Sequence, residues 1–306
     1  MRRKQFGQSS SKLAPDTVQP TAPEFIPLPA RQRALILYED RNVLVIDKPA
    51  NWMLAPRHWK HTSRNLQRVL EIAIQEHHAW VKRRNIRFLR YVHRLDAETS
   101  GLLILARNRL ALTRFTRLFE TGSVKKRYVA IVAGLPPKTW HCSKPISFCK
   151  VPQPQVKVGR ADGKPASTTF TRLASYTLPS SADCSVVLAE PQTGRMHQIR
   201  AHLWATGFPV LGDPLYWDAG LNRDKFRAGS TDYPLALRAV GLEYPDPFTR
   251  AERRITAEAS HFLAAFRAPK PVIETVENAV KNWPTRSGQL PNNRTEHSNR
   301  QDIHNG

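Results

Sequence analysis

The order of apolar and polar positions from residue 34 onward predicts a mixture of strands and helices. In "ALILYEDRNVLVIDKP", two aliphatic runs flank residues 39–42, which is the pattern of a β-hairpin. The run "GLLILAR", from Gly101, is apolar throughout and predicts a buried strand. Further strands are predicted at residues 88–92, 127–134, 154–159, 166–176 and 184–190, with a late hairpin from 235–244 and 252–257.

Helical spacing of apolar residues separates these strands. Thr62 or Ser63 is expected to cap a helix that begins near Leu66, and Asn108 to cap one that stops at Gly122. A third helix is predicted over residues 195–206, and two closing helices over 260–266 and 272–280. Because strands and helices alternate without a strict βαβ rhythm, the predicted fold class is α+β with a mixed central sheet.

Composition divides the chain into three parts. Residues 1–30, rich in Ser, Pro, Gln and Thr, predict a disordered basic arm, and residues 284–306 a disordered polar tail. Residues 31–283 predict one folded domain, large enough for an enzyme and without an internal repeat. The N-terminus lacks the apolar core of a secretory signal, and no stretch reaches the length of a membrane span. Three cysteines without a CxxC pair fit reduced thiols, so we expect a cytoplasmic protein.

Charge points to a polyanionic partner. The chain carries 47 Lys and Arg against 25 Asp and Glu, a net charge of +22. The excess gathers at residues 82–94, 125–127 and 195–200, which favours nucleic acid or an acidic membrane surface. No P-loop occurs, and no Gly-x-Gly-x-x-Gly follows a strand, so nothing indicates a nucleotide cofactor.

Asp96 stands in the polar turn "YVHRLDAETSG", between two apolar runs. The ordinary interpretation is an Asx-turn, in which the carboxylate accepts from backbone N–H groups. Two observations favour chemistry instead, because Arg94 is two residues away and the preceding strand is rich in arginine. Nearby cations keep a carboxylate ionised, and an ionised carboxylate is available as a nucleophile.

Several segments, in order, resemble the RluA-type pseudouridine synthases. These are "DKPANWML", "HRLDAETSGLLILARN", "VKKRYVAIVAGLP", "GKPASTTFTRL" and "EPQTGRMHQIRAHLWATGFPVLGDPLYW", and the resemblance covers about residues 34–260. It implies the pseudouridine synthase fold, in which the mixed sheet is largely antiparallel and flanked by helices. Some family members begin with an S4 domain, and we expect none here, since residues 1–30 stand in its place.

The resemblance implies roles for individual residues. Asp96 would be the catalytic nucleophile, attacking a uridine at either C6 or C1′. Tyr128 would stack on the flipped base and Arg200 would pair with Asp96, whereas the residues alone indicate a core aromatic and a solvated arginine. Arg94 would help open the RNA stem. The candidates for RNA contact are Arg90, His93, Lys126, Arg195 and His197; the last shares a helix face with Arg200.

The resemblance also implies an isomerase that needs no cofactor and no metal. Its partner would be a tRNA or rRNA stem-loop, with no obligate protein partner. Lack of an S4 domain tilts the expectation slightly towards a tRNA, or towards a small stem-loop shared by tRNA and rRNA. Two departures from the family pattern, Arg238 and Asp246, are expected to bear on substrate contacts. The alternative is a non-catalytic RNA-binding module or chaperone. A deaminase or nuclease would need metal ligands, and His58, His61, His77 and His78 are better explained as solvated.

Overall fold

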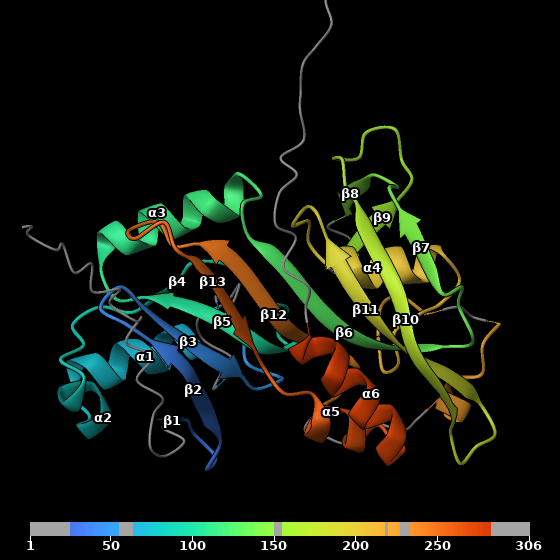
Figure 1. Cartoon of the computed structure of the whole chain (residues 1–306), viewed down its shortest axis with the longest axis horizontal. Coiled ribbons are helices and arrows are strands. Elements are labelled where there is room, and N and C mark those ends of the chain that lie inside the picture. Colours follow the sequence, from blue (N-terminus) through green and yellow to red (C-terminus); the bar gives the residue numbers. More distant parts are fainter. Residues whose placement is uncertain (1–24, 55–63, 150–154, 218–219, 227–232, 283–306) are drawn as a thin grey trace, which may run out of the picture.

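The computed structural model describes residues 25–54, 64–149, 155–217, 220–226 and 233–282. Within these ranges one mixed sheet of eleven strands forms the centre of the molecule, with helices packed around it (Figure 1). Its order is β1-β2-β3-β5-β12-β6-β11-β10-β7, with β13 beside β12 and β4 beside β5. Among the named strands only β5 and β12 pair in parallel, so the predicted α+β class with a largely antiparallel sheet is confirmed.

The strands are β1 Phe25–Pro27, β2 Arg33–Glu39, β3 Val43–Lys48, β4 Arg90–Tyr91, β5 Ser100–Ala106, β6 Lys125–Ala133, β7 Thr139–Cys142, β8 Ile146–Cys149, β9 Gln155–Val158, β10 Thr168–Thr177, β11 Asp183–Pro191, β12 Leu237–Pro245 and β13 Glu252–Thr256. The helices are α1 Leu66–Gln75, α2 Ala79–Arg83, α3 Arg109–Glu120, α4 Gln198–Ala205, α5 Ser260–Ala265 and α6 Lys270–Lys281, with a 3-10 turn at Arg223–Phe226. None of the helices in the described ranges has the length and apolar character needed to cross a membrane.

Residues 43–46 of β3 and 102–106 of β5 are apolar without interruption, because both faces of this half of the sheet are covered. Leu44 and Leu103 point into the cluster that contains α1 and α2. Val45 and Leu102, one position along each strand, point into the cluster that contains α3. Successive side chains of a strand face opposite ways, so two helical layers explain why "GLLILA" is apolar throughout.

The helix starts test the predicted caps. Asn108 caps α3 as predicted, accepting from the N–H of Ala111 (2.7 Å). For α1 the prediction was wrong: Asn65 is the cap and accepts from the N–H of Arg68 (3.1 Å), while Thr62 and Ser63 lie outside the described residues. Asn is at least as good a cap as Ser or Thr, so residue type alone does not exclude Asn65.

The second half of the sheet has its own core. Strands β6, β10 and β11 share one apolar cluster with α4, α5 and α6, represented by Leu203, Phe262 and Val276. Strand β12 joins the two halves, since it pairs in parallel with β5 and antiparallel with β6. At this junction Gly101 has φ +111°, and a Cβ there would collide with the backbone oxygen of Ala239. Only glycine fits, which explains the Gly of the Thr-Ser-Gly sequence.

Some short elements were not predicted. β1 pairs with β2, so ordered structure begins before the predicted domain boundary at residue 31. Strands β7 and β8 and helix α2 were also missed, and the helix predicted over residues 195–206 begins only at Gln198. Residues 1–24, which are most of the predicted arm, and residues 283–306, which include the predicted tail, lie outside the described residues.

The expectation that Arg238 and Asp246 bear on substrate contacts was wrong. Arg238 is 5% exposed and holds both carboxylate oxygens of Asp47 (3.0 and 2.6 Å), while its Nε donates to the carbonyl of Glu258 (2.8 Å). Asp246 is buried and accepts from the N–H groups of Phe248 and Thr249, closing the β12–β13 turn. Both residues therefore tie strands together.

Replacing Arg238 by Met is expected to lower the free energy of unfolding by about 2–3 kcal/mol, because one partner of a largely buried ion pair is removed while Asp47 stays partly solvated. Urea denaturation followed by circular dichroism measures the loss. In a double-mutant cycle, adding Asp47→Asn should cost clearly less in the Arg238→Met background than in the wild type. Full additivity of the two substitutions would mean that the pair contributes nothing.

Candidate active site

A pocket of about 690 Å³ opens between the two halves of the sheet. It is lined by residues 92–96 from the loop before β5, by Lys126 and Tyr128 of β6, and by residues 191–200, which lead into α4. Asp96 lies in this wall. Its backbone carbonyl accepts from the N–H of Thr99 (3.2 Å), which closes the turn and leaves the carboxylate facing the pocket. The carboxylate is thus not used in an Asx-turn.

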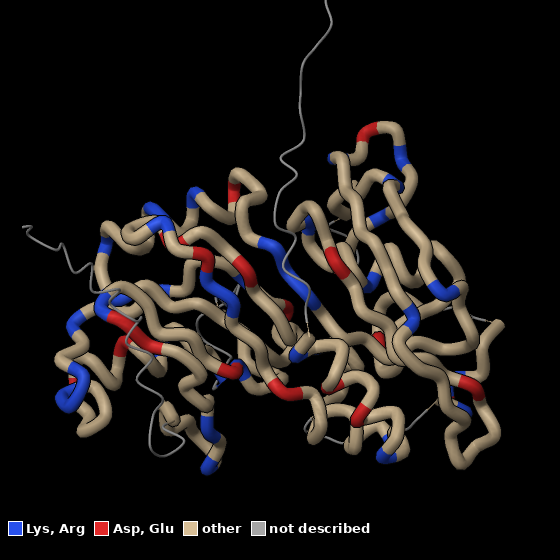
Figure 2. Tube along the Cα trace, viewed as in Figure 1, with Lys and Arg blue, Asp and Glu red and all other residues tan. Residues whose placement is uncertain are grey.

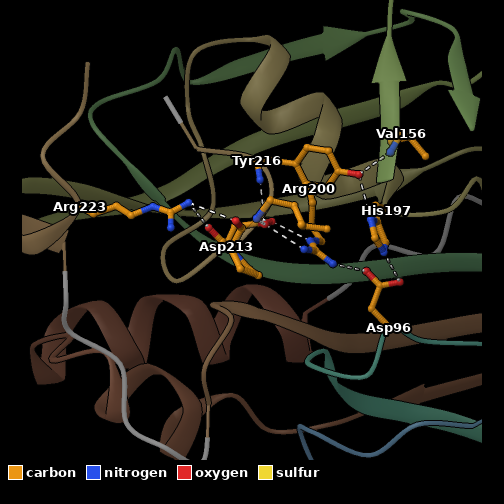
Figure 3. Close-up of polar contacts among 9 residues, drawn as sticks. Asp96, Val156, His197, Arg200, Asp213, Tyr216 and Arg223 are labelled. Atoms are coloured by element: carbon orange, nitrogen blue, oxygen red, sulfur yellow. Dashed lines mark hydrogen bonds and ion pairs between the residues drawn. The ribbon is translucent and has the colours of Figure 1, made fainter. Parts of the chain in front are cut away.

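The Asp96 carboxylate meets an arginine from the other half of the sheet. Oδ2 accepts from Nη1 of Arg200 at 3.0 Å (Figure 3). The remaining edge of the guanidinium is held by Asp213, whose two oxygens lie 2.7 Å from Nε and 2.9 Å from Nη2. The predicted pairing of Arg200 with Asp96 is therefore present in the structure. The interpretation of Arg200 as a solvated arginine fails, since it is 1% exposed.

Two carboxylates around Arg200 keep it charged in spite of burial. Burial by itself lowers the pKa of an arginine, but Asp213, followed by Asp96, raises the pKa of Arg200 above its ordinary value. Asp213 is in turn fixed by the backbone N–H groups of Leu215 and Tyr216 (2.9 and 3.1 Å) and by the nearby Arg223, which donates to its carbonyl (3.0 Å; Figure 3). The cation that orients Asp96 is therefore itself rigidly placed.

His197 approaches the second carboxylate oxygen. Its Nε2 lies 3.9 Å from Oδ1 of Asp96. It is the residue that precedes α4, and its φ of +52° turns the chain into the helix. His197 and Arg200 thus reach the same carboxylate, one from the cap and one from the first turn. Burial lowers the pKa of His197 below its usual value, against the pull of Asp96.

Successive side chains of β6 face opposite sides of the sheet, and this separates its three cations. Lys125 and Arg127 point away from the pocket and pair with Glu243 and Glu190 (2.5 and 2.8 Å). Lys126 and Tyr128 share the other face and line the pocket. Figure 2 shows this basic stretch at the start of β6, near the middle of the molecule. Only Lys126 of these three consecutive cations therefore faces the pocket.

Tyr128 stands beside Asp96 in the pocket wall and is half-buried. Burial, and then the charge of Asp96, raises the pKa of its phenol above the ordinary value, so it is neutral at physiological pH. Lys126 donates to the carbonyl of Thr193 (3.0 Å), and burial lowers its pKa. A neutral aromatic face and a carboxylate therefore share one cavity with a cation at its edge.

The other predicted RNA contacts divide by position. Arg94 lines the pocket, is exposed and makes no ion pair within the described residues; Arg195 also lines it, with Nε on the carbonyl of Pro165 (3.0 Å). His93 lines the pocket, but its Nε2 accepts from the N–H of Ile104 and burial lowers its pKa to about 3. Arg90 is not among the lining residues and pairs with Glu71 (2.7 Å).

Three residues that support the site were given no role from the sequence. Lys48 is fully buried, and its ammonium donates to the carbonyls of Pro49, Trp52 and Ala97 (2.9 to 3.0 Å), which holds the loop of Asp96 against β3. Burial lowers the pKa of Lys48 to about 7, against the charges of Asp96 and Glu98. Asp213 and Tyr216 are the others. All three belong to segments quoted for the resemblance, so the spacing was visible but the contacts were not.

The chain is similar to known proteins in both sequence and fold. A family model described as RNA pseudouridylate synthase matches residues 42–205, more than half of the chain. The chain belongs to this family, and the resemblance to its RluA-type members is confirmed. Among solved structures, the human RNA pseudouridylate synthase domain containing 4 is 27% identical, with a TM-score of 0.57, covering 76% of this chain and 92% of that one.

Curated relatives are similar over part of their length. Ribosomal large subunit pseudouridine synthase D of Nitrosomonas europaea is 35% identical over 181 residues, which are 59% of this chain and 49% of that protein. Ribosomal large subunit pseudouridine synthase C of Escherichia coli K12 is 31% identical over 225 residues, 73% of this chain and 66% of that protein. The chain thus spans about half to two thirds of these relatives.

Proposed function

We propose that this protein is an RNA pseudouridine synthase in which Asp96 is the nucleophile. The observation that carries the proposal is the 3.0 Å contact between Arg200 and Oδ2 of Asp96, in a pocket that also contains Tyr128. Arg200 occupies one carboxylate oxygen and leaves Oδ1 facing the cavity. An oriented, ionised carboxylate beside an aromatic ring is what attack on a flipped nucleoside requires.

The reaction is an isomerisation and balances without a co-reactant. Asp96 forms a bond to the uridine, at either C6 of the base or C1′ of the ribose, and the N-glycosidic bond breaks. The uracil turns within the pocket, its C5 bonds to C1′ and the bond to Asp96 is released. A proton then leaves C5, and N1, which has lost its bond to C1′, takes one up. The carboxylate is regenerated. Every atom of the product comes from the substrate except the exchanged proton.

The pocket suits a base removed from its stack. Extrusion of a nucleotide costs a few kcal/mol, and stacking on an aromatic ring returns about 1–3 kcal/mol. Tyr128 offers that ring from the rigid strand β6. Arg94 and Arg195 lie at the pocket, where their side chains would contact phosphates or fill the vacated stack. His93, Lys126 and His197 remain candidates for contact with the nucleotide, and Arg90 for the RNA beyond it.

For the substrate we propose ribosomal RNA. The curated relatives above are named for the large ribosomal subunit, and this is the ground for preferring rRNA to the tRNA that the sequence alone slightly favoured. The +22 charge supplies affinity for either RNA without selecting between them. We also propose that the protein acts in the cytoplasm, because three cysteines without a CxxC pair fit reduced thiols.

Tritium release from RNA transcribed with 5-[³H]uridine tests the proposal, because the C5 hydrogen is lost only when C5 forms the new bond. Large-subunit rRNA fragments and total tRNA should be assayed in parallel at equal uridine concentration. We expect release from rRNA that saturates at a small whole number of sites per molecule. Release from tRNA alone would show that the substrate is tRNA and not rRNA. RNA binding without release from either RNA would favour a non-catalytic binding module.

A further inference from the structure

The hydroxyl of Tyr216 lies between the backbone of Val156 and the ring of His197. Tyr216 is 3% exposed, and its Oη lies 2.8 Å from the backbone nitrogen of Val156 and 2.9 Å from Nδ1 of His197 (Figure 3). A backbone N–H only donates, so the oxygen accepts from Val156. The phenolic hydrogen then has one acceptor within reach among the described residues, Nδ1 of His197. Any other arrangement would leave that hydrogen buried without a partner, which proteins avoid.

The Nε2 side of the His197 ring independently indicates the same tautomer. Nε2 of His197 faces the carboxylate of Asp96, 3.9 Å from Oδ1. A lone pair on Nε2 would oppose the negative charge, whereas an N–H is attracted to it. The carboxylate on one side and the phenol on the other therefore require the same neutral form, with hydrogen on Nε2 and a lone pair on Nδ1.

We infer that Tyr216 is a positioning residue that fixes the tautomer of His197, so that an N–H donor faces the oxygen of Asp96 that Arg200 leaves open. The inference deepens the proposed function and rests on it for its catalytic meaning. With Arg200 on Oδ2 and His197 facing Oδ1, donors flank both oxygens of the nucleophile. The carboxylate is thereby aimed into the pocket, and the gap of 3.9 Å leaves it unbonded on the reactive side.

The charged neighbours of His197 bear on its protonation. Asp96 and Glu98, from the loop before β5, and Asp213 favour the imidazolium, while Arg200 on α4 opposes it. Burial raises the pKa of Tyr216 to about 12, so the phenol keeps its hydrogen at neutral pH. A donor at Nδ1 excludes a second proton there. Removing the hydroxyl should therefore free Nδ1 and let the carboxylates raise the pKa of His197.

The test replaces Tyr216 by Phe, which removes the hydroxyl and keeps the ring against His197. We expect kcat for tritium release to fall about 10–100-fold, with KM for RNA within about twofold of the wild type. The acid limb of the kcat profile should move towards neutral pH. The matched control is Tyr176→Phe, which removes another buried hydroxyl, donating to the carbonyl of Phe266 (2.8 Å). Its kcat and pH profile should stay unchanged.

Nitrogen-15 spectra of histidine-labelled protein read the tautomer directly and do not depend on activity. Subtracting the spectrum of His197→Gln identifies the two nitrogens of His197. We expect the wild type to show a protonated Nε2 and a bare Nδ1, and Tyr216→Phe to lose that preference. A wild-type spectrum with hydrogen on Nδ1, or an unchanged kcat in Tyr216→Phe, would overturn the inference. If no RNA releases tritium, the proposed function fails while the spectrum still decides the tautomer.

Discussion

Asp96→Asn is expected to lower tritium release by on the order of 10⁴-fold or more, because an amide oxygen is not a nucleophile that can form and later release a covalent bond. The substitution is nearly isosteric. Arg200 can still donate to the amide oxygen, and Asp213 still neutralises Arg200, so we expect the free energy of unfolding to change by no more than about 1 kcal/mol. RNA binding should persist or strengthen, since one negative charge leaves the pocket.

The matched control for this prediction is Glu98→Gln. Glu98 lies in the same loop and has the same charge, but it does not line the pocket. Its activity is expected to stay within about threefold of the wild type. Stopped tritium assays, an RNA filter-binding titration and thermal unfolding should be run on both variants. Activity that survives in Asp96→Asn at a tenth of the wild-type rate or more would remove Asp96 from the role of nucleophile.

Arg200→Lys is the second substitution with a large expected effect. Lysine keeps the charge, but its donors all lie on one nitrogen. It therefore cannot hold both oxygens of Asp213 while it also reaches Asp96. We expect kcat to fall about 10²–10³-fold, because Asp96 loses its orientation. The free energy of unfolding should fall by about 2 kcal/mol, less than the ~3–5 kcal/mol of losing a buried ionic partner entirely.

Arg238→Lys is a close structural control for this second prediction. Arg238 is also a buried arginine held by both oxygens of an aspartate, but it is not among the residues that line the pocket. The two variants should lose comparable stability in urea denaturation. Only Arg200→Lys should lose kcat when rates are compared for the folded protein at low temperature. Equal losses of kcat would show that Arg200 acts through general stability and not through Asp96.

The parts of the fold that were predicted correctly are those whose pattern follows from burial. The run from Gly101 was predicted as a buried strand, and β5 is covered on both faces by α1 and α3. Strands β7 and β8 were not predicted, because four residues give only a weak alternation of apolar and polar positions; β9 is equally short and was predicted only within the longer range 154–159. The parallel pairing of β5 with β12 is a long-range contact that no local pattern encodes.

The site shows the same division. Asp96, Tyr128 and Arg200 were found because a family pattern marks them, and the structure brings all three to one pocket. Without that pattern, the residues left Asp96 open between a turn and a nucleophile, and they assigned Tyr128 to the core and Arg200 to solvent. Lys48 acts through the carbonyl of Ala97, which is distant in sequence, and Asp213 through the guanidinium of Arg200. Both contacts are set by the fold, so the spacing of residues in the sequence cannot reveal them.

The central position of β12 has a consequence for the order in which the protein becomes competent during synthesis. Asp96 belongs to the half of the sheet built around β3 and β5, and Arg200 to the half built around β6 and β11; β12 is the strand between them. Chains emerge from the ribosome amino end first, so β3, β5, β6 and β11 are all synthesised before residues 237–245 can be inserted between them. A nascent chain therefore carries every proposed catalytic side chain before it has a framework that brings them together. We therefore expect Asp96 and Arg200 to come together only after β12 has entered the sheet.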